Sequence, residues 1–419
     1  MTRVVVIGGG VVGLAAAIAL LRDGHAVTIV EPGVPGGEQS ASYGNGTLLN
    51  PSSVVPMSSP GLWKKVPGYL ADPLGPLTIR WSYLPRLLPW LRRFVAAGSG
   101  VAKVEATGRA LRPLVADAPA LHRKLAEDAG VGDLIVRQGV LFAFPNRAAF
   151  EAEALTWRIR RENGTRWLEL DADELRQREP ALDRRYSFGI LVEENGQCRD
   201  PGAYTAALAR YAAELGATIV LTGATGFRLE AGRLCAVKTR DGEVACDKAV
   251  IAAGAWSKAL AREAGDIVPL ESERGYHVVI ENPGIDLRHP VMPSDGKMAC
   301  AMTPAGLRLA GQVELAGLDA APNWQRAEAL LKFARGVFPA LPADTPLDSV
   351  QLWMGHRPST PDGLPCLSLA SGCPDVLHAF GHGHVGLAAA VTTGKVVADM
   401  LAGRPPAFDL APYSAARFG

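Results

Sequence analysis

The sequence predicts an α/β fold: a Rossmann-like dinucleotide-binding domain, split along the chain, joined to an α+β domain with an antiparallel sheet. Three observations predict it. Residues 4–31 have the order strand, glycine loop, helix, strand, acidic residue. A buried strand at residues 248–256 ends in small residues, and residues 272–311 have the pattern of antiparallel strands. With 419 residues the chain exceeds one compact core, so two domains or one with a large insert are expected.

The opening unit contains a β-branched strand, three glycines at G-x-G-x-x-G spacing, an apolar helix, a glycine that ends the helix, and a second strand. In chain order these are residues 4–7, Gly8, Gly10, Gly13, residues 14–21, Gly24 and residues 26–30. The continuous Val-Val-Val-Ile run fits a strand buried on both faces. Gly24 is expected to be the left-handed cap of the helix.

Each part of this unit has a physical function. Gly8 permits a tight turn, Gly10 lets backbone N–H groups approach a pyrophosphate, and Gly13 lets the helix pack close to the sheet. The helix N-terminus, where Val12 lies, directs partial positive charge toward phosphates. Glu31 at the end of the second strand would accept hydrogen bonds from a ribose diol and repel a 2′-phosphate, which disfavours NADP. The complete unit predicts a dinucleotide site but leaves NAD and FAD open.

A loop rich in glycine, proline and serine follows at residues 32–46. Its small side chains, hydroxyls and free N–H groups suit an extended diphosphate and a flat ring laid against the backbone. The alternative is an ordinary long loop. We favour cofactor binding, with contacts from Ser40, Ser42, Asn45 and Gly46.

Residues 75–94 interleave arginines with leucines and aromatic residues. Pro76, Pro85 and Pro89 are expected to break any long helix there. Such an amphipathic segment can lie on an anionic membrane surface. The alternative, which we favour, is an insert that packs on its own domain and keeps its arginines in water.

The remaining elements separate into a middle section with mixed patterns, expected to be the substrate domain, and a return of the nucleotide-domain pattern from Asp200. Helices are expected at residues 101–130 (two, parted near Pro113 and Pro119), 148–163, 175–179, 203–215 (capped by Gly216), 324–338 and 387–401. Strands are expected at residues 134–144, 218–221, 248–256, 272–280, 291–303, 307–311, 350–354 and 376–380, with a strand pair around Asp241-Gly242.

Composition places limits on function. Apolar residues make up 48% of the chain, and 43 Lys and Arg against 42 Asp and Glu give a net charge of +1, which offers no indication of nucleic-acid binding. The six cysteines form no C-x-x-C pair, which predicts reduced thiols and no metal site. The first strand begins at residue 3 or 4, which leaves no room for a cleavable signal, and no apolar run is long enough for a spanning helix. We expect a cytoplasmic protein, with peripheral contact at the inner face of the membrane as an alternative.

Four motifs in order resemble the D-amino-acid oxidase superfamily of FAD-dependent oxidases and dehydrogenases, which includes glycine oxidase, sarcosine oxidase and bacterial D-amino-acid dehydrogenase. They are the N-terminal unit, Ala-Ala-Gly-Ala-Trp at residues 252–256, G-x-R-P-x-T-P-D-G at residues 355–363, and G-x-G-x-x-G at residues 381–386. The resemblance covers essentially the whole chain. The Asn45-Gly46 loop and the Pro/Trp/Leu/Arg stretch after it are most similar to the bacterial dehydrogenase branch.

The resemblance implies a fold and a cofactor. The fold is an FAD-binding domain of the glutathione-reductase type in residues 1–60, 195–265 and 345–419, with an α+β substrate domain in residues 61–194 and 266–344. Related sarcosine oxidases tether their flavin through a cysteine just before Thr-Pro-Asp. The matching position here is Gly355, so non-covalent FAD is expected.

The resemblance also assigns site residues. Arg357 would clamp the substrate carboxylate, because a planar guanidinium matches a carboxylate bidentately. Tyr276 and His277 would face the flavin from the substrate domain, and His277 or His384 could accept a proton from the substrate ammonium. Besides the N-terminal residues already given, FAD contacts are implied for Ala253, Gly254, Trp256, Gly381, Gly383, His384, Val385, Gly386 and Leu387.

The implied activity is oxidation of the Cα–N bond of a small amino acid, either a D-amino acid or a cyclic secondary one such as a D-proline derivative. Hydride would pass to flavin N5. We expect a dehydrogenase that passes electrons to a quinone or another carrier. The alternatives are a glycine- or sarcosine-type oxidase that uses oxygen, a non-catalytic FAD-binding electron-transfer subunit, and an NAD-dependent dehydrogenase.

Overall fold

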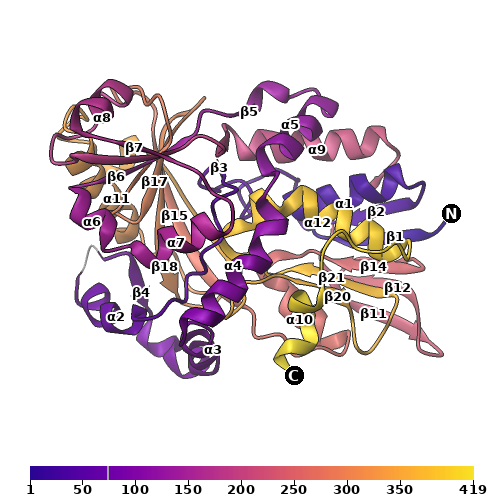
Figure 1. Cartoon of the computed structure of the whole chain (residues 1–419). Coiled ribbons are helices and arrows are strands. Elements are labelled where there is room, and N and C mark those ends of the chain that lie inside the picture. The colour runs from indigo at the N-terminus through magenta and orange to yellow at the C-terminus, as the bar shows by residue number, and fades with distance from the viewer. Residues whose placement is uncertain (73–74) are drawn as a thin grey trace.

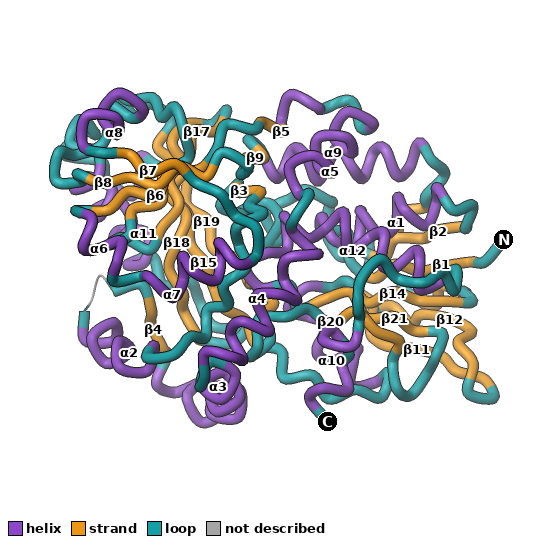
Figure 2. The backbone as a smooth tube through the Cα atoms, in the orientation of Figure 1, coloured by secondary structure: helices purple, strands orange, loops and turns teal. Residues whose placement is uncertain are grey.

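The computed structural model describes residues 1–72 and 75–419, and two large sheets dominate its architecture (Figures 1 and 2). A six-stranded sheet lies near the two chain ends, and a nine-stranded sheet lies on the other side of the molecule. The predicted combination of a nucleotide-binding sheet with a largely antiparallel sheet is confirmed. The segment boundaries given above stay a prediction.

The six-stranded sheet collects strands from three distant parts of the chain. In spatial order these are β10 (Thr218–Val220), β2 (Ala26–Val30), β1 (Arg3–Ile7), β14 (Lys248–Ile251), β21 (Val376–Phe380) and β20 (Cys366–Leu369). All neighbouring pairs are parallel except the pair of β20 and β21. The opening unit of the sequence therefore forms the centre of the sheet, as its apolar pattern predicts.

Both faces of this sheet are covered. Val4 and Val6 of β1 pack into one apolar cluster with α1 (Val11–Arg22), α9 (Pro201–Glu214) and α12 (Gly386–Leu401). Their neighbours Val5 and Ile7 point the other way, into a cluster beneath β11–β13 and α10. This alternation follows from the two-residue period of a strand. The elements of the second face are β11 (Ala224–Glu230), β12 (Arg233–Thr239), β13 (Gly242–Ala245) and α10 (Ser257–Glu263).

The nine-stranded sheet carries the substrate-domain elements. Its order is β19 (Gln351–Ser359), β15 (Glu271–Ile280), β18 (Gly306–Leu315), β17 (Met298–Thr303), β16 (Val291–Pro293), β6 (Val140–Phe144), β8 (Phe188–Val192) and β7 (Leu168–Leu170), with β4 (Leu77–Ile79) paired to β18. Most pairs are antiparallel, but β16 with β6 and β4 with β18 are parallel. β15 is buried along its whole length, so side chains on both of its faces pack inside the protein.

Short elements complete the chain. A small sheet joins β3 (Leu48–Leu49), β9 (Gly196–Cys198) and β5 (Ile135–Val136). The other helices are α2 (Leu62–Ala71), α3 (Leu84–Ala97), α4 (Val101–Val115), α5 (Ala118–Asp128), α6 (Arg147–Glu151), α7 (Ala154–Glu162), α8 (Ala172–Arg178) and α11 (Gln325–Val337). The predicted helix pair at residues 101–130 is confirmed as α4 and α5. The single helix expected at residues 148–163 is instead the pair α6 and α7, and the strand expected at residues 134–144 is divided into β5 and β6 at Gly139, whose φ is +74°.

The expectation that prolines break any long helix at residues 75–94 is wrong for α3. Pro85 lies in its first turn, where an N–H is not needed, and Pro89 lies inside the helix, where one intrahelical hydrogen bond is lost. Packing stabilises the helix: Leu87 and Trp90 are buried, and the Trp90 indole N–H donates to the carbonyl of Ser359 at 3.1 Å. The segment thus packs on its own protein through these residues, and its contact with a membrane stays an untested alternative.

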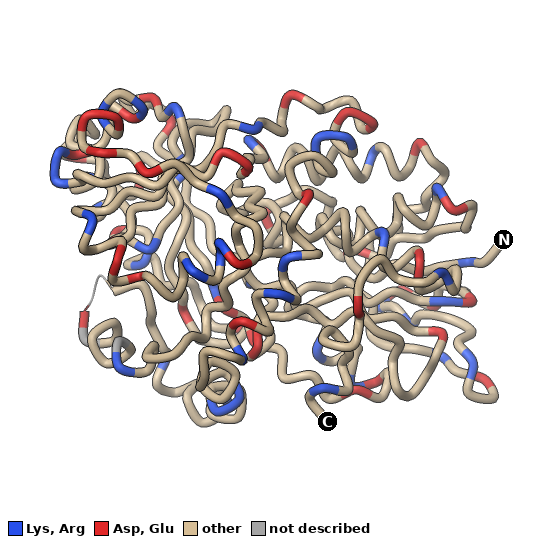
Figure 3. Tube along the Cα trace, in the orientation of Figure 1, with Lys and Arg blue, Asp and Glu red and all other residues tan. Residues whose placement is uncertain are grey.

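Charged residues of both signs are interspersed along the trace (Figure 3), as the near-zero net charge suggests. Within residues 1–72 and 75–419, no helix has the length and apolar character needed to cross a bilayer. Nor do the His, Cys, Asp and Glu side chains of these residues form a cluster of three or more that could hold a metal ion.

Candidate active site

A cavity of about 1550 Å³ lies where the two large sheets meet, and most of the predicted site residues line it. Those that do are Gly8, Gly10, Val12, Glu31, Ser40, Ser42, Asn45, Gly46, Ala253, Gly254, Trp256, Arg357, Gly381, Gly383, His384, Val385, Gly386 and Leu387. Gly13, Tyr276 and His277 are not among the lining residues. Tertiary folding therefore brings together motifs that are up to about 380 residues apart in the chain.

The glycines of the opening unit lie in places where a side chain would collide with the backbone. A Cβ at Gly13 would lie 1.9 Å from the carbonyl oxygen of Gly8, so α1 packs tightly against the turn. Gly8 itself has φ +116°, and its Cβ would lie 2.3 Å from the carbonyl oxygen of Ala252. Gly13 therefore acts behind the cavity wall, by close packing, while Gly8 and Gly10 form the wall.

The N-terminus of α1 and the carboxylate of Glu31 border the same part of the cavity. The Val11 N–H donates to the Ser42 hydroxyl at 3.0 Å, and the Gly9 N–H donates to the Glu31 carboxylate at 2.7 Å. A helix N-terminus for phosphates and an acidic residue for a ribose diol are the two parts of a dinucleotide cradle. The residues present thus fit a dinucleotide cofactor.

The loop of residues 32–46 folds back over the second sheet. The Trp353 indole N–H donates to the carbonyl of Glu38 at 2.8 Å, and a Cβ at Gly44 would lie 2.0 Å from the Trp353 ring. Arg308 donates to the carbonyls of Tyr43 and Asn45. These contacts hold the loop as an ordered wall between the two sheets, with Ser40, Ser42, Asn45 and Gly46 on the cavity side.

Arg357 reaches the cavity from β19, on the side of the nine-stranded sheet. Its guanidinium lies directly over Gly275, where a Cβ would be 2.2 Å from Nη2, and it donates to the carbonyls of Gln312 at 3.0 Å and Gly311 at 3.4 Å. Burial lowers the pKa of Arg357, and the charge of Glu273 opposes that shift. Two of five N–H donors are used in this way, which leaves donors for a ligand in the cavity.

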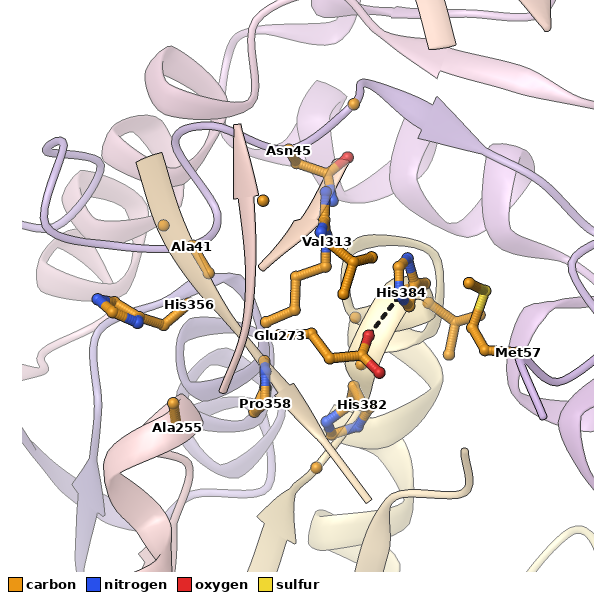
Figure 4. Close-up of a pocket in the computed structure, with 18 of the residues that line it drawn as sticks. Ala41, Asn45, Met57, Ala255, Glu273, Val313, His356, Pro358, His382 and His384 are labelled. Atoms are coloured by element: carbon orange, nitrogen blue, oxygen red, sulfur yellow. Dashed lines mark hydrogen bonds and ion pairs between the residues drawn. The ribbon is translucent and has the colours of Figure 1, made fainter. Parts of the chain in front are cut away.

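Glu273 lies opposite Arg357 in the pairing of β15 with β19, and sequence reasoning did not identify it. Its carboxylate receives a hydrogen bond from His384 Nε2 at 2.7 Å; Figure 4 shows Glu273 directed toward His384, with Asn45 and Met57 on the same cavity. Burial alone would raise the pKa of Glu273, but the hydrogen bond and charge of His384, with the charge of Arg357, lower it below its ordinary value. Glu273 lies in the polar run Glu-Ser-Glu-Arg that opens β15, so no local pattern in the sequence separates it from Glu271.

His384 and His382 lie in the turn that precedes α12 and differ in their surroundings. The His384 side chain is 34% exposed, on the cavity, and retains access to a ligand. His382 is buried, with its Nε2 2.9 Å from the Thr393 hydroxyl, and burial lowers its pKa to about 4. His384 is therefore the accessible histidine of the pair.

Tyr276 and His277, expected to face the flavin ring, lie outside the cavity lining. The Tyr276 hydroxyl donates to the Glu314 carboxylate and accepts the Asn323 N–H, so it belongs to a buried network. His277 is covered by the loop of residues 32–46, stacked on Trp353 at 5.1 Å, with burial lowering its pKa to about 3. Adjacent strand residues point to opposite faces, and on both faces protein rather than cavity receives these side chains.

Comparison with known families gives a match to the model of the DAO family, FAD dependent oxidoreductase, over residues 3–400. The chain belongs to this family. The predicted family and the predicted FAD dependence are thereby confirmed. That the cradle around Gly8, Gly10 and Glu31 holds the FAD stays a prediction.

Relatives of this DAO-family chain span nearly its whole length. A D-amino-acid oxidase of Bradyrhizobium diazoefficiens is 57% identical over 416 residues, with 99% of both chains covered. A D-amino acid dehydrogenase of Paramagnetospirillum magneticum is 32% identical, again with 99% of both covered. Among solved structures, glycine oxidase from Geobacillus kaustophilus has a TM-score of 0.74 at 24% identity, covering 100% of this chain and 99% of that one, which supports the fold.

Proposed function

We propose that this protein oxidises the Cα–N bond of D-amino acids, with the carboxylate held by Arg357 and the amine beside the His384–Glu273 pair. FAD, when bound, supplies the acceptor for the hydride that leaves Cα. The observation that carries the proposal is that a guanidinium with free donors and a histidine–carboxylate pair face one cavity shared with the FAD cradle. The 57% identical D-amino-acid oxidase supports the substrate class.

Arg357 orients the substrate. Its two hydrogen bonds to carbonyls of β18 fix the guanidinium plane, so a carboxylate that binds the remaining N–H groups is held in one direction. Fixed orientation accelerates hydride transfer, because the reacting Cα–H must be aligned with the acceptor atom before reaction. An electron-transfer subunit has no need of such a clamp, which argues against the non-catalytic alternative.

His384 is proposed to take a proton from the substrate ammonium, since the amine must be neutral before hydride can leave. The Glu273 carboxylate holds the imidazole in place through Nε2 and stabilises the positive charge that appears on the ring when it accepts the proton. Glu273 acts through His384 and is therefore a positioning residue. The tautomer consistent with this role has Nε2–H toward Glu273 and Nδ1 toward the cavity.

We propose oxygen as the electron acceptor, which revises the expectation of a dehydrogenase. The relative that supports oxygen is 57% identical, whereas the D-amino acid dehydrogenases are 30–32% identical. The alternative acceptor is a quinone or another electron carrier. The side chains of Trp63 and Trp81, which are 63% and 68% exposed, support this alternative, because they could contact a membrane that holds a quinone. We also propose that FAD is bound non-covalently, because Gly355 occupies the position of the cysteine that tethers the flavin in related sarcosine oxidases.

The decisive test is anaerobic bleaching of the yellow protein by a panel of D- and L-amino acids, followed by reoxidation. Bleaching by D-amino acids, with peroxide formed on admission of air as fast as an artificial dye is reduced, supports the oxidase. Bleaching with slow reaction in air supports the dehydrogenase instead. Absence of bleaching by every amino acid, including glycine, sarcosine and D-proline, would overturn amine oxidation.

A further inference from the structure

A second guanidinium, that of Arg160 on α7, lines the same cavity and forms no ion pair with the residues that the structure describes. Among the described residues no carboxylate lies within 4.0 Å of it, and it donates no hydrogen bond to them. Its Nε is buried without an acceptor. The charge of Glu153 raises the pKa of Arg160, but the Glu153 carboxylate itself forms an ion pair with Lys297 at 3.1 Å.

Two other enclosed arginines, Arg274 and Arg417, have acceptors for their N–H groups. Arg274 donates to the carbonyls of residues 317, 318, 320 and 321, and Arg417 donates to the Asp362 carboxylate and to carbonyls. Burying a charged group without hydrogen-bond partners costs free energy. An enclosed guanidinium that lacks such partners therefore indicates a place where a bound ligand supplies them. The Nε atoms of Arg308 and Arg335 also lack an acceptor, but both guanidiniums donate to backbone carbonyls and neither lines the cavity. Arg160 lines the cavity and has no acceptor for any of its N–H groups among the described residues.

Aromatic rings fix the position of the Arg160 guanidinium. Its central carbon lies 4.8 Å from the ring centre of Phe142 and 4.3 Å from that of Trp157. Two flanking rings hold the planar group and leave its edge N–H groups for the cavity. Burial lowers the pKa of Arg160 to about 10, so the group stays charged at neutral pH.

Between Arg357 and Arg160, the floor of the cavity is formed by one row of residues that runs across neighbouring strands of the nine-stranded sheet. Val291 lies opposite Cys300, which places Met292 opposite Ala299; Ala299 pairs with Ala310, and Met292 pairs with Phe142. All four residues of the row line the cavity: Ala310, Ala299, Met292 and Phe142. From β18, where Arg357 is anchored, to β6 is three strand spacings, or about 14 Å. The floor is small and apolar, with a cation toward each end.

From this arrangement we propose that Arg160 forms a second anion site, which binds a carboxylate at the end of the substrate side chain. The substrate class is then D-amino acids with an acidic side chain, such as D-glutamate and its one-carbon-longer homologue, whose methylenes cross the apolar floor. The inference rests on the proposed function, because Arg357 must hold the α-carboxylate. Arg160 is here a specificity-determining residue, remote from the reacting bond.

The first experiment measures binding, so it does not depend on turnover. Calorimetric titration of the FAD-loaded protein compares glutarate with butyrate, and succinate, glutarate and adipate with one another. A dicarboxylate that reaches both arginines is expected to bind at least about tenfold more tightly than butyrate. The Arg160→Met variant is expected to remove that advantage and leave butyrate binding unchanged. Equal binding of glutarate and butyrate by the wild-type protein overturns the proposal.

The second experiment measures specificity with matched substrates. Arg160→Met should lower kcat/KM for D-glutamate at least about tenfold and change kcat/KM for D-glutamine and D-methionine less than about twofold. Arg160→Lys should recover part of the D-glutamate activity. Arg161→Met is the control, because Arg161 is the neighbouring exposed residue, stacked on Trp167 and outside the cavity lining.

The outcomes separate this inference from the proposed function. A uniform loss for D-glutamate, D-glutamine and D-methionine would show that Arg160 supports the fold or steers every substrate, and so overturns the specificity role. Absence of turnover with all amino acids, together with tight glutarate binding that depends on Arg160, would overturn amine oxidation and keep the second anion site. If Arg160→Met loses its FAD spectrum, Arg160→Lys and the dicarboxylate series in the wild-type protein still decide the question.

Discussion

The Glu273 carboxylate and the His384 imidazole lie 2.7 Å apart although 111 residues separate them in the chain. Glu273 comes from the nine-stranded sheet and His384 from the turn before α12, so the pair joins the two halves of the cavity (Figure 4). Arg357 lies across from Glu273 on the neighbouring strand. One buried carboxylate thus faces both the guanidinium proposed to hold the substrate and the imidazole proposed to accept its proton.

Replacing Arg357 by lysine should impair catalysis more than folding. Lysine keeps a positive charge but loses the planar fork, so kcat/KM for D-amino acids is expected to fall by about 10- to 150-fold. Steady-state kinetics with a D-amino acid measure the effect, and the FAD absorbance checks that the cofactor is retained. Arg109→Lys, at an exposed position of α4, is the control. Unchanged kcat/KM in Arg357→Lys would argue against the carboxylate clamp.

Replacing Glu273 by glutamine should lower kcat with little change in KM, because the amide retains a hydrogen-bond acceptor but no longer stabilises a charged His384. Glu271→Gln is the matched control, since Glu271 is a buried acid on the same strand that bonds Tyr83 instead. A similar fall of kcat in both variants would point to a general effect of buried acids on the strand.

The same carboxylate gives a stability prediction. The pKa of Glu273 is lower in the folded protein than in the unfolded chain, so the unfolded chain binds the proton first as the pH falls. Its stabilising contribution is present above the ordinary glutamate pKa near 4.5 and is lost as the pH falls through the folded value. Thermal unfolding temperatures at pH 3.5 to 5.5 should therefore depend less steeply on pH in Glu273→Gln than in wild type.

Buried neutral histidines should make the stability of the protein fall already at a higher pH than the protonation of Glu273 does. Burial lowers the pKa of His277 to about 3 and those of His356 and His382 to about 4, from an ordinary 6.5. The unfolded chain takes up these protons first, so stability is full above pH 6.5 and falls toward pH 4, by about 1.4 kcal/mol per histidine and pH unit. Urea unfolding from pH 7.5 to 4.5 measures the slope, and His382→Gln should reduce it.

Replacing Gly13 by alanine should destabilise the six-stranded sheet and its helix α1, because the added Cβ would lie 1.9 Å from the Gly8 carbonyl oxygen and α1 would have to move. We expect a loss of about 1–3 kcal/mol, measured by thermal unfolding, and weaker FAD retention. Gly68→Ala is the control, because nothing lies within 4 Å of its added Cβ in α2. That variant should keep wild-type stability or gain up to about 1 kcal/mol.

The sequence by itself determined the elements whose cause is local. The strand at β1, the turn at Gly8 and the acid at Glu31 follow one another within about 30 residues, so spacing and residue type were enough to predict the cradle. Arg357 was assigned differently, through the resemblance of its short motif to the D-amino-acid oxidase superfamily. The helix α3 was not predicted from the sequence, because the buried packing of Trp90 outweighs the loss of the hydrogen bond that Pro89 removes.

Tertiary structure alone decided which side chains face the cavity. Glu273 and His384 meet, and Arg160 lies on the wall beyond Phe142, because of strand register and helix placement that no local pattern encodes. Tyr276 and His277 share β15 with Glu273 but are covered by protein. Alternation along a strand assigns a residue to a face, and only the packing of distant segments decides whether that face meets ligand or protein.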